Sequence, residues 1–160
     1  MEFRIGTGFD AHKLADGRLL VLGGVMVPHE KGLLGHSDSD ALCHALSDAV
    51  LGAAALGDMG KYFPDTDPRW KGADSLKMLA ECVRLAKHKG WSVGNADATI
   101  VCQRPKLSPF ILSMREKVAV ALGVELDRVS VKAKTTEGMG FEGREEGISV
   151  QAVALLYKES

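Results

Sequence analysis

The chain has 160 residues and a hydrophobic share of 46%, values typical of one compact domain spanning residues 1–160. Its 20 basic and 21 acidic residues leave a formal net charge of −1, which argues against the strongly basic surface of a nucleic-acid-binding protein. No apolar run is long enough to cross a bilayer, and no secretory signal is recognisable. We therefore expect neither nucleic acid nor membrane as a partner, and a cytoplasmic location, or the plastid stroma if a transit peptide has been removed.

Strand-like and helix-like patterns alternate along the chain. In chain order they predict a strand (residues 1–10), a hairpin (19–22 and 25–27), two helices (38–56 and 74–89), a strand (91–103), a helix (110–122) and two final strands (129–134 and 148–157). Gly23-Gly24 supplies the hairpin turn, and Ser37 or Asp38 is expected to cap the first helix. This mixture predicts an α/β fold, an α+β sandwich whose mixed sheet carries helices on one face.

The cysteines Cys43, Cys82 and Cys102 lie far apart and form no C-x-x-C pair. An odd number of scattered cysteines is typical of reduced thiols rather than of disulfides or a metal site. We expect them to pack as small apolar groups.

A possible metal site begins with Asp10 and His12, which lie two residues apart at the end of the first predicted strand and so point to the same face. With His44 of the first helix as a third ligand, a zinc-class cation would keep an open fourth position, as catalytic zinc does. Asp40, His44 and Asp48 share a helix face, and Asp48 could orient an imidazole. Alternatively, Asp10 serves a turn, His12 is solvated and His44 is a core histidine with its hydrogen bonds satisfied.

His36 and Ser37 precede the predicted helix. Free N–H groups and the positive end of the helix dipole attract phosphate at such a position. A phosphate contact is therefore one interpretation of the pair, and simple helix capping is the other.

Two further loops carry groups that could bind a phosphorylated polyol. Asp58, Asp65 and Asp67 could accept hydrogen bonds from substrate hydroxyls or could merely form turns. Thr135–Glu137 open a glycine-rich segment in which hydroxyls could contact phosphate and a carboxylate could help to hold magnesium. Arg144 could bind an anion or form a surface salt bridge. From the residues alone we expect a zinc-dependent enzyme acting on a phosphorylated polyol.

Five motifs follow one another along the chain: GFDAH (8–12), HSDSDALCHALSD (36–48), GDMGKYFPDTDP (57–68), GADS (72–75) and TTEGMGFEGR (135–144). In this order they strongly resemble the 2-C-methyl-D-erythritol 2,4-cyclodiphosphate synthase family. The resemblance runs from about Arg4 to Tyr157, nearly the whole chain.

This resemblance implies a homotrimer in which the sheets face the trimer axis and the active sites lie between neighbouring subunits. It implies conversion of 4-diphosphocytidyl-2-C-methyl-D-erythritol 2-phosphate into the cyclic 2,4-diphosphate and CMP, in the non-mevalonate route to isoprenoid precursors. The 2-phosphate would attack the β-phosphorus without a protein nucleophile. The implied cofactors are one divalent metal such as zinc per subunit, and magnesium or manganese with the substrate diphosphate.

Carried over to matching positions, the resemblance makes Asp10, His12 and His44 the zinc ligands and Glu137 the magnesium ligand. His36 and Thr135 would stabilise the transition state, and Ser37 would contact phosphate. Lys134 and Thr136 are also expected to contact the substrate. Lys134 stands where a third threonine often precedes the T-T-E run.

The resemblance also implies three binding regions. An erythritol pocket would comprise Asp58, Gly60, Phe63, Pro64, Asp65, Thr66 and Asp67. A cytidine pocket belonging to the adjacent subunit would comprise Cys102, Pro105, Lys106, Leu107 and Ser108. Phe141 and Arg144 would line a cavity on the trimer axis that can hold an isoprenoid-like diphosphate.

Two other functions remain open on the same residues. A zinc-dependent phosphohydrolase would use a similar metal site but release inorganic phosphate or a linear product. A non-catalytic trimeric binder of isoprenoid diphosphates would bind without turnover.

Overall fold

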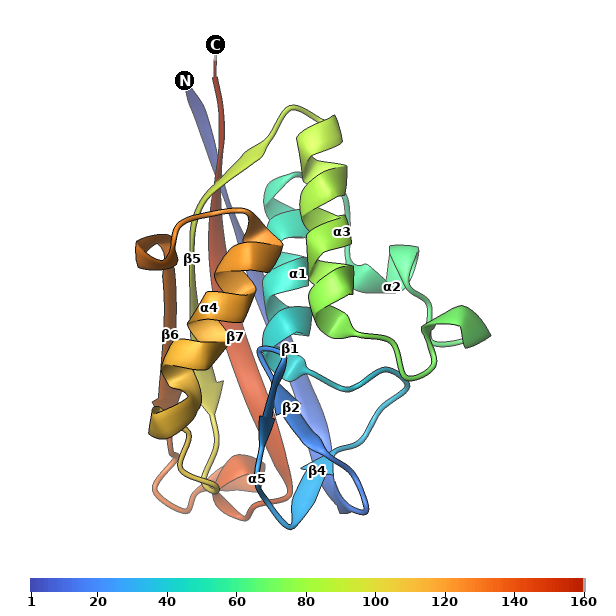
Figure 1. The fold of residues 1–160 in the computed structure, drawn as a ribbon, viewed down its shortest axis with the longest axis vertical. Helices are drawn as coiled ribbons and strands as arrows, with labels where there is room; N and C mark the ends of the chain where they lie inside the picture. The colour runs from blue at the N-terminus through green and yellow to red at the C-terminus, as the bar shows by residue number, and fades with distance from the viewer. Residues whose placement is uncertain (160) are drawn as a thin grey trace.

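The computed structural model describes residues 1–159 and has a mixed sheet covered by helices (Figure 1). The strands are β1 (Glu2–Asp16), β2 (Leu20–Leu22), β3 (Val25–Val27), β4 (Lys31–Leu33), β5 (Ser92–Val101), β6 (Val129–Lys134) and β7 (Gly147–Lys158). The helices are α1 (Ala41–Ala53), α2 (Met59–Tyr62), α3 (Ser75–His88), α4 (Ile111–Leu122) and α5 (Gly140–Gly143). Short 3₁₀ turns lie at Pro68–Trp70, Ser108–Phe110 and Leu126–Arg128.

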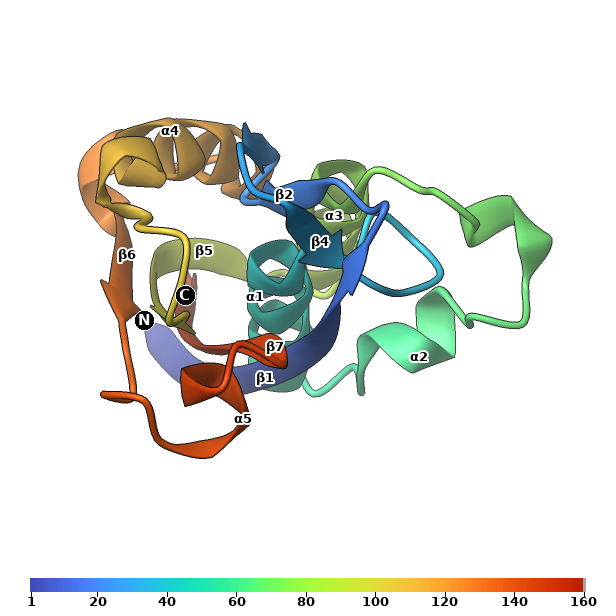
Figure 2. The same cartoon turned by 90° about the horizontal axis from the view of Figure 1, so that it is seen from below.

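The large sheet has the strand order β4-β1-β7-β5-β6, and β2 pairs with β3 separately. Neighbouring strands of the large sheet are antiparallel, except for β5 and β6, which run parallel. The sheet curls around α1, with α3 and α4 on the same side (Figure 2). The predicted α/β sandwich with helices on one face of a mixed sheet is therefore confirmed.

Some predicted boundaries were wrong. The first strand does not end at Asp10 but continues to Asp16, because its last residues pair with β4 after its earlier ones pair with β7. Helix α1 is capped by Asp40, not by Ser37 or Asp38. The short elements β4, α2 and α5 were missed, since three or four residues carry no readable periodicity.

Helix α1 is apolar around nearly its whole circumference because it is enclosed. It contacts β1 and β7 on one side and α3 on another. Its buried residues include Leu42, Leu46 and Val50, whereas His44 and Asp48 are only partly buried. A helix enclosed in this way needs no continuous polar face, so its few polar side chains have to meet specific partners. Among residues 1–159, no helix combines the length and the apolar character needed to cross a membrane.

Asp40 fastens the β2–β3 turn to the start of α1. Its completely buried carboxylate accepts hydrogen bonds from the backbone N–H groups of Gly23 (2.9 Å), Gly24 (2.7 Å) and Cys43 (3.1 Å). Burial raises the pKa of Asp40, and these three hydrogen bonds oppose the rise. The expectation that Asp40 shares a functional helix face with His44 was wrong, because a capping side chain turns back toward the helix start.

All three cysteines are free and buried, as predicted. Burial raises the pKa of the Cys82 thiol to about 12 and that of Cys102 to about 11. Thiols with such values are protonated at neutral pH and are poor nucleophiles.

Two glycines of β1 allow its backbone to lie directly against α1. A Cβ atom on Gly6 would lie 2.1 Å from the carbonyl oxygen of Ala49, and one on Gly8 would lie 1.8 Å from that of Ala45. Real Cβ atoms essentially never approach another heavy atom to under 3.0 Å. Glycine at these positions therefore sets the distance between β1 and α1.

The face of the sheet opposite the helices is exposed and apolar. Side chains alternate along a strand, so alternate residues of β1 point to this face. Phe3, Ile5 and Phe9 of β1 are 57%, 71% and 58% exposed, and Val153 of β7 is 44% exposed. Contiguous apolar patches of this kind are typical of interaction surfaces.

Replacement of Gly8 by alanine is expected to lower the free energy of unfolding by about 1–3 kcal/mol, because the added methyl group would force α1 away from β1. Gly52→Ala is the matched control. Gly52 is exposed on α1, and its added Cβ would make only an ordinary contact of 3.8 Å with the carbonyl oxygen of Thr7. That variant should gain about 0.5–1 kcal/mol. Urea unfolding measures both, and undiminished stability of Gly8→Ala would contradict the close approach.

Candidate metal centre and substrate pocket

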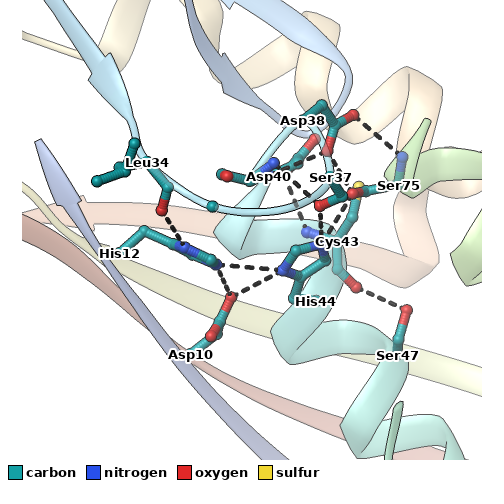
Figure 3. Close-up of polar contacts among 12 residues, drawn as sticks. Asp10, His12, Leu34, Ser37, Asp38, Asp40, Cys43, His44, Ser47 and Ser75 are labelled. Atoms are coloured by element: carbon teal, nitrogen blue, oxygen red, sulfur yellow. Dashed lines mark hydrogen bonds and ion pairs between the residues drawn. The ribbon is translucent and has the colours of Figure 1, made fainter. Parts of the chain in front are cut away.

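Three side chains from two elements meet at one point (Figure 3). Asp10 and His12 point from β1 toward α1, and His44 projects from α1 toward them. Oδ2 of Asp10 lies 2.9 Å from Nε2 of His12 and 3.0 Å from Nδ1 of His44, and the two nitrogens are 3.3 Å apart. The three atoms lie within 4.8 Å of one another, so one cation could contact all of them. Two imidazole nitrogens and one carboxylate oxygen suit a zinc-class ion with an open coordination position.

The two imidazoles also determine the charge of the cluster. Burial raises the pKa of the Asp10 carboxyl, but the hydrogen bonds and charges of His12 and His44 outweigh that effect and lower it to about 2. Burial lowers the pKa of His12, but Asp10 and a hydrogen bond to the Leu34 carbonyl raise it overall. Asp10 is therefore ionised at neutral pH and available as a ligand.

His12 is held by a hydrogen bond of 2.9 Å from its Nδ1 to the carbonyl oxygen of Leu34. A carbonyl only accepts, so Nδ1 carries a proton. In the neutral ring the lone pair is then at Nε2, the atom that faces the cluster.

His36 and Ser37 stand beside the cluster in a pocket of about 320 Å³ that Phe63 and Asp65 also line. Nε2 of His36 donates to the carbonyl oxygen of Asp67 at 3.1 Å. The expectation that the pair lies at the helix N-terminus was wrong, because a loop separates both residues from α1. Their position beside the cluster nevertheless suits contact with the same ligand.

Two of the aspartates in the loop after α1, Asp58 and Asp67, stabilise local turns and do not line the pocket. The Asp58 carboxylate caps α2, and the Asp67 carboxylate caps the next turn and pairs with Arg69 at 2.7 Å. These contacts fit the turn-forming alternative for both aspartates. Other residues expected in an erythritol pocket lie in the same segment but do not line this cavity: Gly60, Pro64 and Thr66.

A second pocket lies at the carboxyl ends of β5 and β6. Because these strands are parallel, the segments that follow them leave the same edge of the sheet. The residues expected in the cytidine pocket line one pocket: Cys102, Pro105, Lys106, Leu107 and Ser108. Lys134 and Thr135, which were expected to contact the substrate elsewhere, line the same pocket. Cys102 and Leu107 are only 4% and 2% exposed, so their side chains pack in the core beneath the pocket.

The glycine-rich segment folds into a tight turn beside this second pocket. The Thr136 hydroxyl donates to a carbonyl inside the turn, and Glu137 adopts a left-handed conformation with φ 54°. The N–H of Gly138 donates to the side-chain oxygen of Gln103 at 3.2 Å. This contact ties the segment that carries Glu137 to the loop after β5.

Phe141 and Arg144 lie at the opposite end of the same segment. Phe141 lines a shallow hollow with Lys13 of β1. Arg144 forms an exposed ion pair with Glu146 at 3.0 Å, which is the surface salt bridge of the alternative interpretation.

The two pockets lie in different parts of the chain. Asp10 and His12 of the candidate metal cluster are on β1, the second pocket is at the end of β6, and β7 and β5 lie between these strands. At about 4.8 Å per strand, three steps across the sheet amount to roughly 14 Å. The chain therefore carries two separate pockets.

Comparison with known proteins assigns the chain to a family. The sequence pattern of the YgbB family matches residues 3–157. The chain belongs to the YgbB family. A 2-C-methyl-D-erythritol 2,4-cyclodiphosphate synthase of Pseudomonas putida (strain W619) is 63% identical over 153 residues, which cover 96% of this chain and 98% of that protein. The family resemblance inferred from the motifs is confirmed.

Solved structures share the fold. A 2C-methyl-D-erythritol-2,4-cyclodiphosphate synthase in its CDP-bound form has a TM-score of 0.88 and 40% identity, covering 96% of this chain and 100% of that one. A CDP complex of IspF from Plasmodium falciparum has a TM-score of 0.86 and 31% identity, covering 99% of this chain and 97% of that one.

The apolar wall of the pocket beside Asp10, His12 and His44 was not predicted from the sequence. Met59, Trp70 and Met78 line it, and Phe63 meets Trp70 edge to face at 4.9 Å between ring centroids. Met78 follows the apolar pattern of α3, so nothing local distinguishes it from a core residue. Trp70 ends the 3₁₀ turn Pro68–Trp70, a segment in which no sequence pattern predicts the orientation of its side chain.

Arg18 was missed as well, although it braces the loop that carries His36 and Ser37. Its guanidinium donates to the carbonyl oxygens of Leu33 (2.9 Å), Gly35 (3.3 Å) and Ser37 (3.2 Å) and to the hydroxyl of Ser39 (3.2 Å). A lone arginine after a strand gives no sequence signal of such a role.

Asp48 has a different role from the predicted one. Its Oδ1 accepts a hydrogen bond of 2.8 Å from the N–H of Met59, so it joins α1 to α2 and does not orient an imidazole. Burial raises the pKa of Asp48, and the Met59 hydrogen bond only partly offsets this effect.

Asp48→Asn is therefore expected to stabilise the metal-free protein at pH 7. A raised pKa in the folded state means that folding disfavours the ionised form. This penalty is present above the folded-state pKa and disappears as the pH falls below the ordinary value of 3.8. Thermal unfolding should show a higher melting temperature for the variant at pH 7, with the two proteins converging toward pH 3.8. A difference that grows as the pH falls would contradict this account.

Proposed function

We propose that the chain converts 4-diphosphocytidyl-2-C-methyl-D-erythritol 2-phosphate into 2-C-methyl-D-erythritol 2,4-cyclodiphosphate and CMP, the phosphorus–oxygen lyase step of non-mevalonate isoprenoid biosynthesis. The observation that carries this proposal is the convergence of Asp10, His12 and His44 beside His36 and Ser37 in a chain of the YgbB family. An oxygen of the substrate's 2-phosphate bonds to the β-phosphorus. The bond from that phosphorus to the CMP oxygen breaks, and the electron pair leaves with CMP.

The chain's own residues would bind and orient the two phosphates for this in-line displacement. We assign His36 and Thr135 to contacts that balance the charge developing on the phosphate oxygens, and Ser37 to a phosphate contact. No protein nucleophile is required, which agrees with the buried thiols of the three cysteines.

We propose one zinc-class cation per subunit, held by Asp10, His12 and His44. The donor set fits, since an ionised carboxylate and two imidazole nitrogens converge within one coordination sphere. When bound, the ion would draw electron density from a phosphate oxygen. Glu137 is the proposed protein ligand of a magnesium or manganese ion carried by the substrate diphosphate.

We propose further that single-domain subunits form a homotrimer with active sites between neighbours. Two observations support this: the apolar open face of β1 and β7, and the separation of the two pockets across the sheet. The second pocket of one subunit, with Pro105, Lys106 and Ser108, would then hold cytidine opposite the metal pocket of another. Phe141 and Arg144 would lie near the axis, where an isoprenoid-like diphosphate could bind. We expect this assembly in the cytoplasm.

A phosphorus NMR assay tests the reaction. Purified protein, the cytidyl substrate, zinc and magnesium should yield the cyclic diphosphate and CMP, and a protein that forms neither would refute the proposal. Release of inorganic phosphate or a linear product would support the phosphohydrolase, whereas tight binding of an isoprenoid diphosphate without turnover would support the binder.

His44→Ala should lose bound zinc, measured by elemental analysis, together with most of its activity.

Mixed trimers test the shared active site. His44→Ala and Lys106→Ala subunits should each be inactive alone, because one lacks the metal half-site and the other the cytidine half-site. After refolding together in equal amounts, about a quarter of the sites would combine two intact halves, so about a quarter of wild-type activity should return. Activity that stays at the level of the separate variants would contradict sites built between subunits.

A further inference from the structure

A chain of polar side chains leads from His44 away from the metal cluster (Figure 3). Nε2 of His44 lies 2.8 Å from the hydroxyl oxygen of Ser75, the first residue of α3. The Ser75 hydroxyl in turn contacts Oδ1 of Asp38, in the loop before α1. Ser75 is completely buried. We propose that Asp38 and Ser75 are positioning residues that hold His44 in the tautomer whose Nδ1 lone pair faces the metal.

Asp38 determines the direction of this chain. A carboxylate accepts hydrogen bonds and cannot donate them. The backbone N–H of Ser75 donates to its Oδ2 at 3.0 Å, and the N–H of Asp40 donates to its Oδ1 at 3.1 Å. The Ser75 hydroxyl has a single proton, and its contact with the carboxylate directs that proton to Asp38. The hydroxyl oxygen is left as an acceptor.

His44 must therefore donate from Nε2 to Ser75. In the neutral ring Nδ1 then carries no proton, and its lone pair points at the cluster. The Leu34 carbonyl imposes the complementary arrangement on His12, whose Nδ1 is protonated and whose Nε2 faces the cluster. Both imidazoles are thus prepared as ligands by acceptors on their far sides.

Two neighbouring groups favour the competing tautomer of His44, in which Nδ1 carries the proton. Asp10 lies 3.0 Å from Nδ1 of His44 and would attract a proton there. The Ser37 hydroxyl, 3.2 Å from Nε2, can rotate to donate to an unprotonated Nε2. Without Ser75 and Asp38, the proton could therefore settle on Nδ1, where it would have to be displaced before a metal could bind.

This inference rests on the proposed metal site, and zinc affinity measures it independently of turnover. In competition with a chromophoric chelator, Ser75→Ala should bind zinc about 10–100-fold more weakly than the unchanged protein. Ser47→Ala is the matched control, because Ser47 is also completely buried and its hydroxyl donates to the Cys43 carbonyl within α1. The control should bind zinc as the unchanged protein does. Equal affinities for the two variants would overturn the proposal.

A second measurement needs no variant and so does not depend on Ser75→Ala folding. Long-range ¹H–¹⁵N spectra of the metal-free protein with labelled histidine, recorded at pH 8, should show the His44 proton on Nε2. A proton predominantly on Nδ1 would overturn the proposal. Failure of the proposed reaction would appear instead as missing cyclic diphosphate in the phosphorus NMR assay, with the tautomer and the zinc affinities as stated here.

Discussion

The close approach of β1 and α1 is the constraint on which the rest of the structure depends. Gly6 and Gly8 remove the Cβ atoms that would otherwise collide with carbonyl oxygens of the helix. The helix can therefore lie on the strand with backbone against backbone, and Nδ1 of His44 lies 3.0 Å from Oδ2 of Asp10. A metal site with ligands from both a β-strand and a helix requires this close approach, because the ligand atoms must converge to within a few ångströms.

The polar residues around α1 divide between fastening the fold and building the site. Asp40 ties the helix start to the hairpin, Asp48 ties the helix to α2, and Ser47 bonds to a carbonyl within the helix. His44 contributes to the metal cluster, and behind it Ser75 connects to the loop before α1. A buried polar group is costly without a partner, so each of these side chains has one. Their shared helix therefore does not imply a shared function.

The separation of the two pockets links the proposed assembly to the proposed function. The metal pocket belongs to the β1 side of the sheet and the second pocket to the carboxyl ends of β5 and β6. Under the proposed function, the cytidine and the erythritol phosphate of one substrate would occupy different pockets, so a single subunit would hold only part of it. The apolar face of β1 and β7 offers the surface through which subunits could bring two half-sites together.

The sequence by itself determined the order of the long elements, the hairpin at Gly23-Gly24 and, through its motifs, the family. It also suggested that Asp10, His12 and His44 belong together, because a D-x-H pair on a strand and a histidine on a helix are the donors a zinc-class ion uses. Only the tertiary structure decided that Asp40 and Asp48 accept hydrogen bonds from backbone N–H groups rather than from the imidazoles. It also decided that Arg18 braces the loop of His36 and Ser37, and that Ser75 contacts His44. Periodicity states which face of an element a side chain occupies, whereas its partner depends on what the fold packs against that face. For the same reason β4, α2 and α5 were not predicted, since elements of three or four residues are stabilised by long-range contacts rather than by their own pattern.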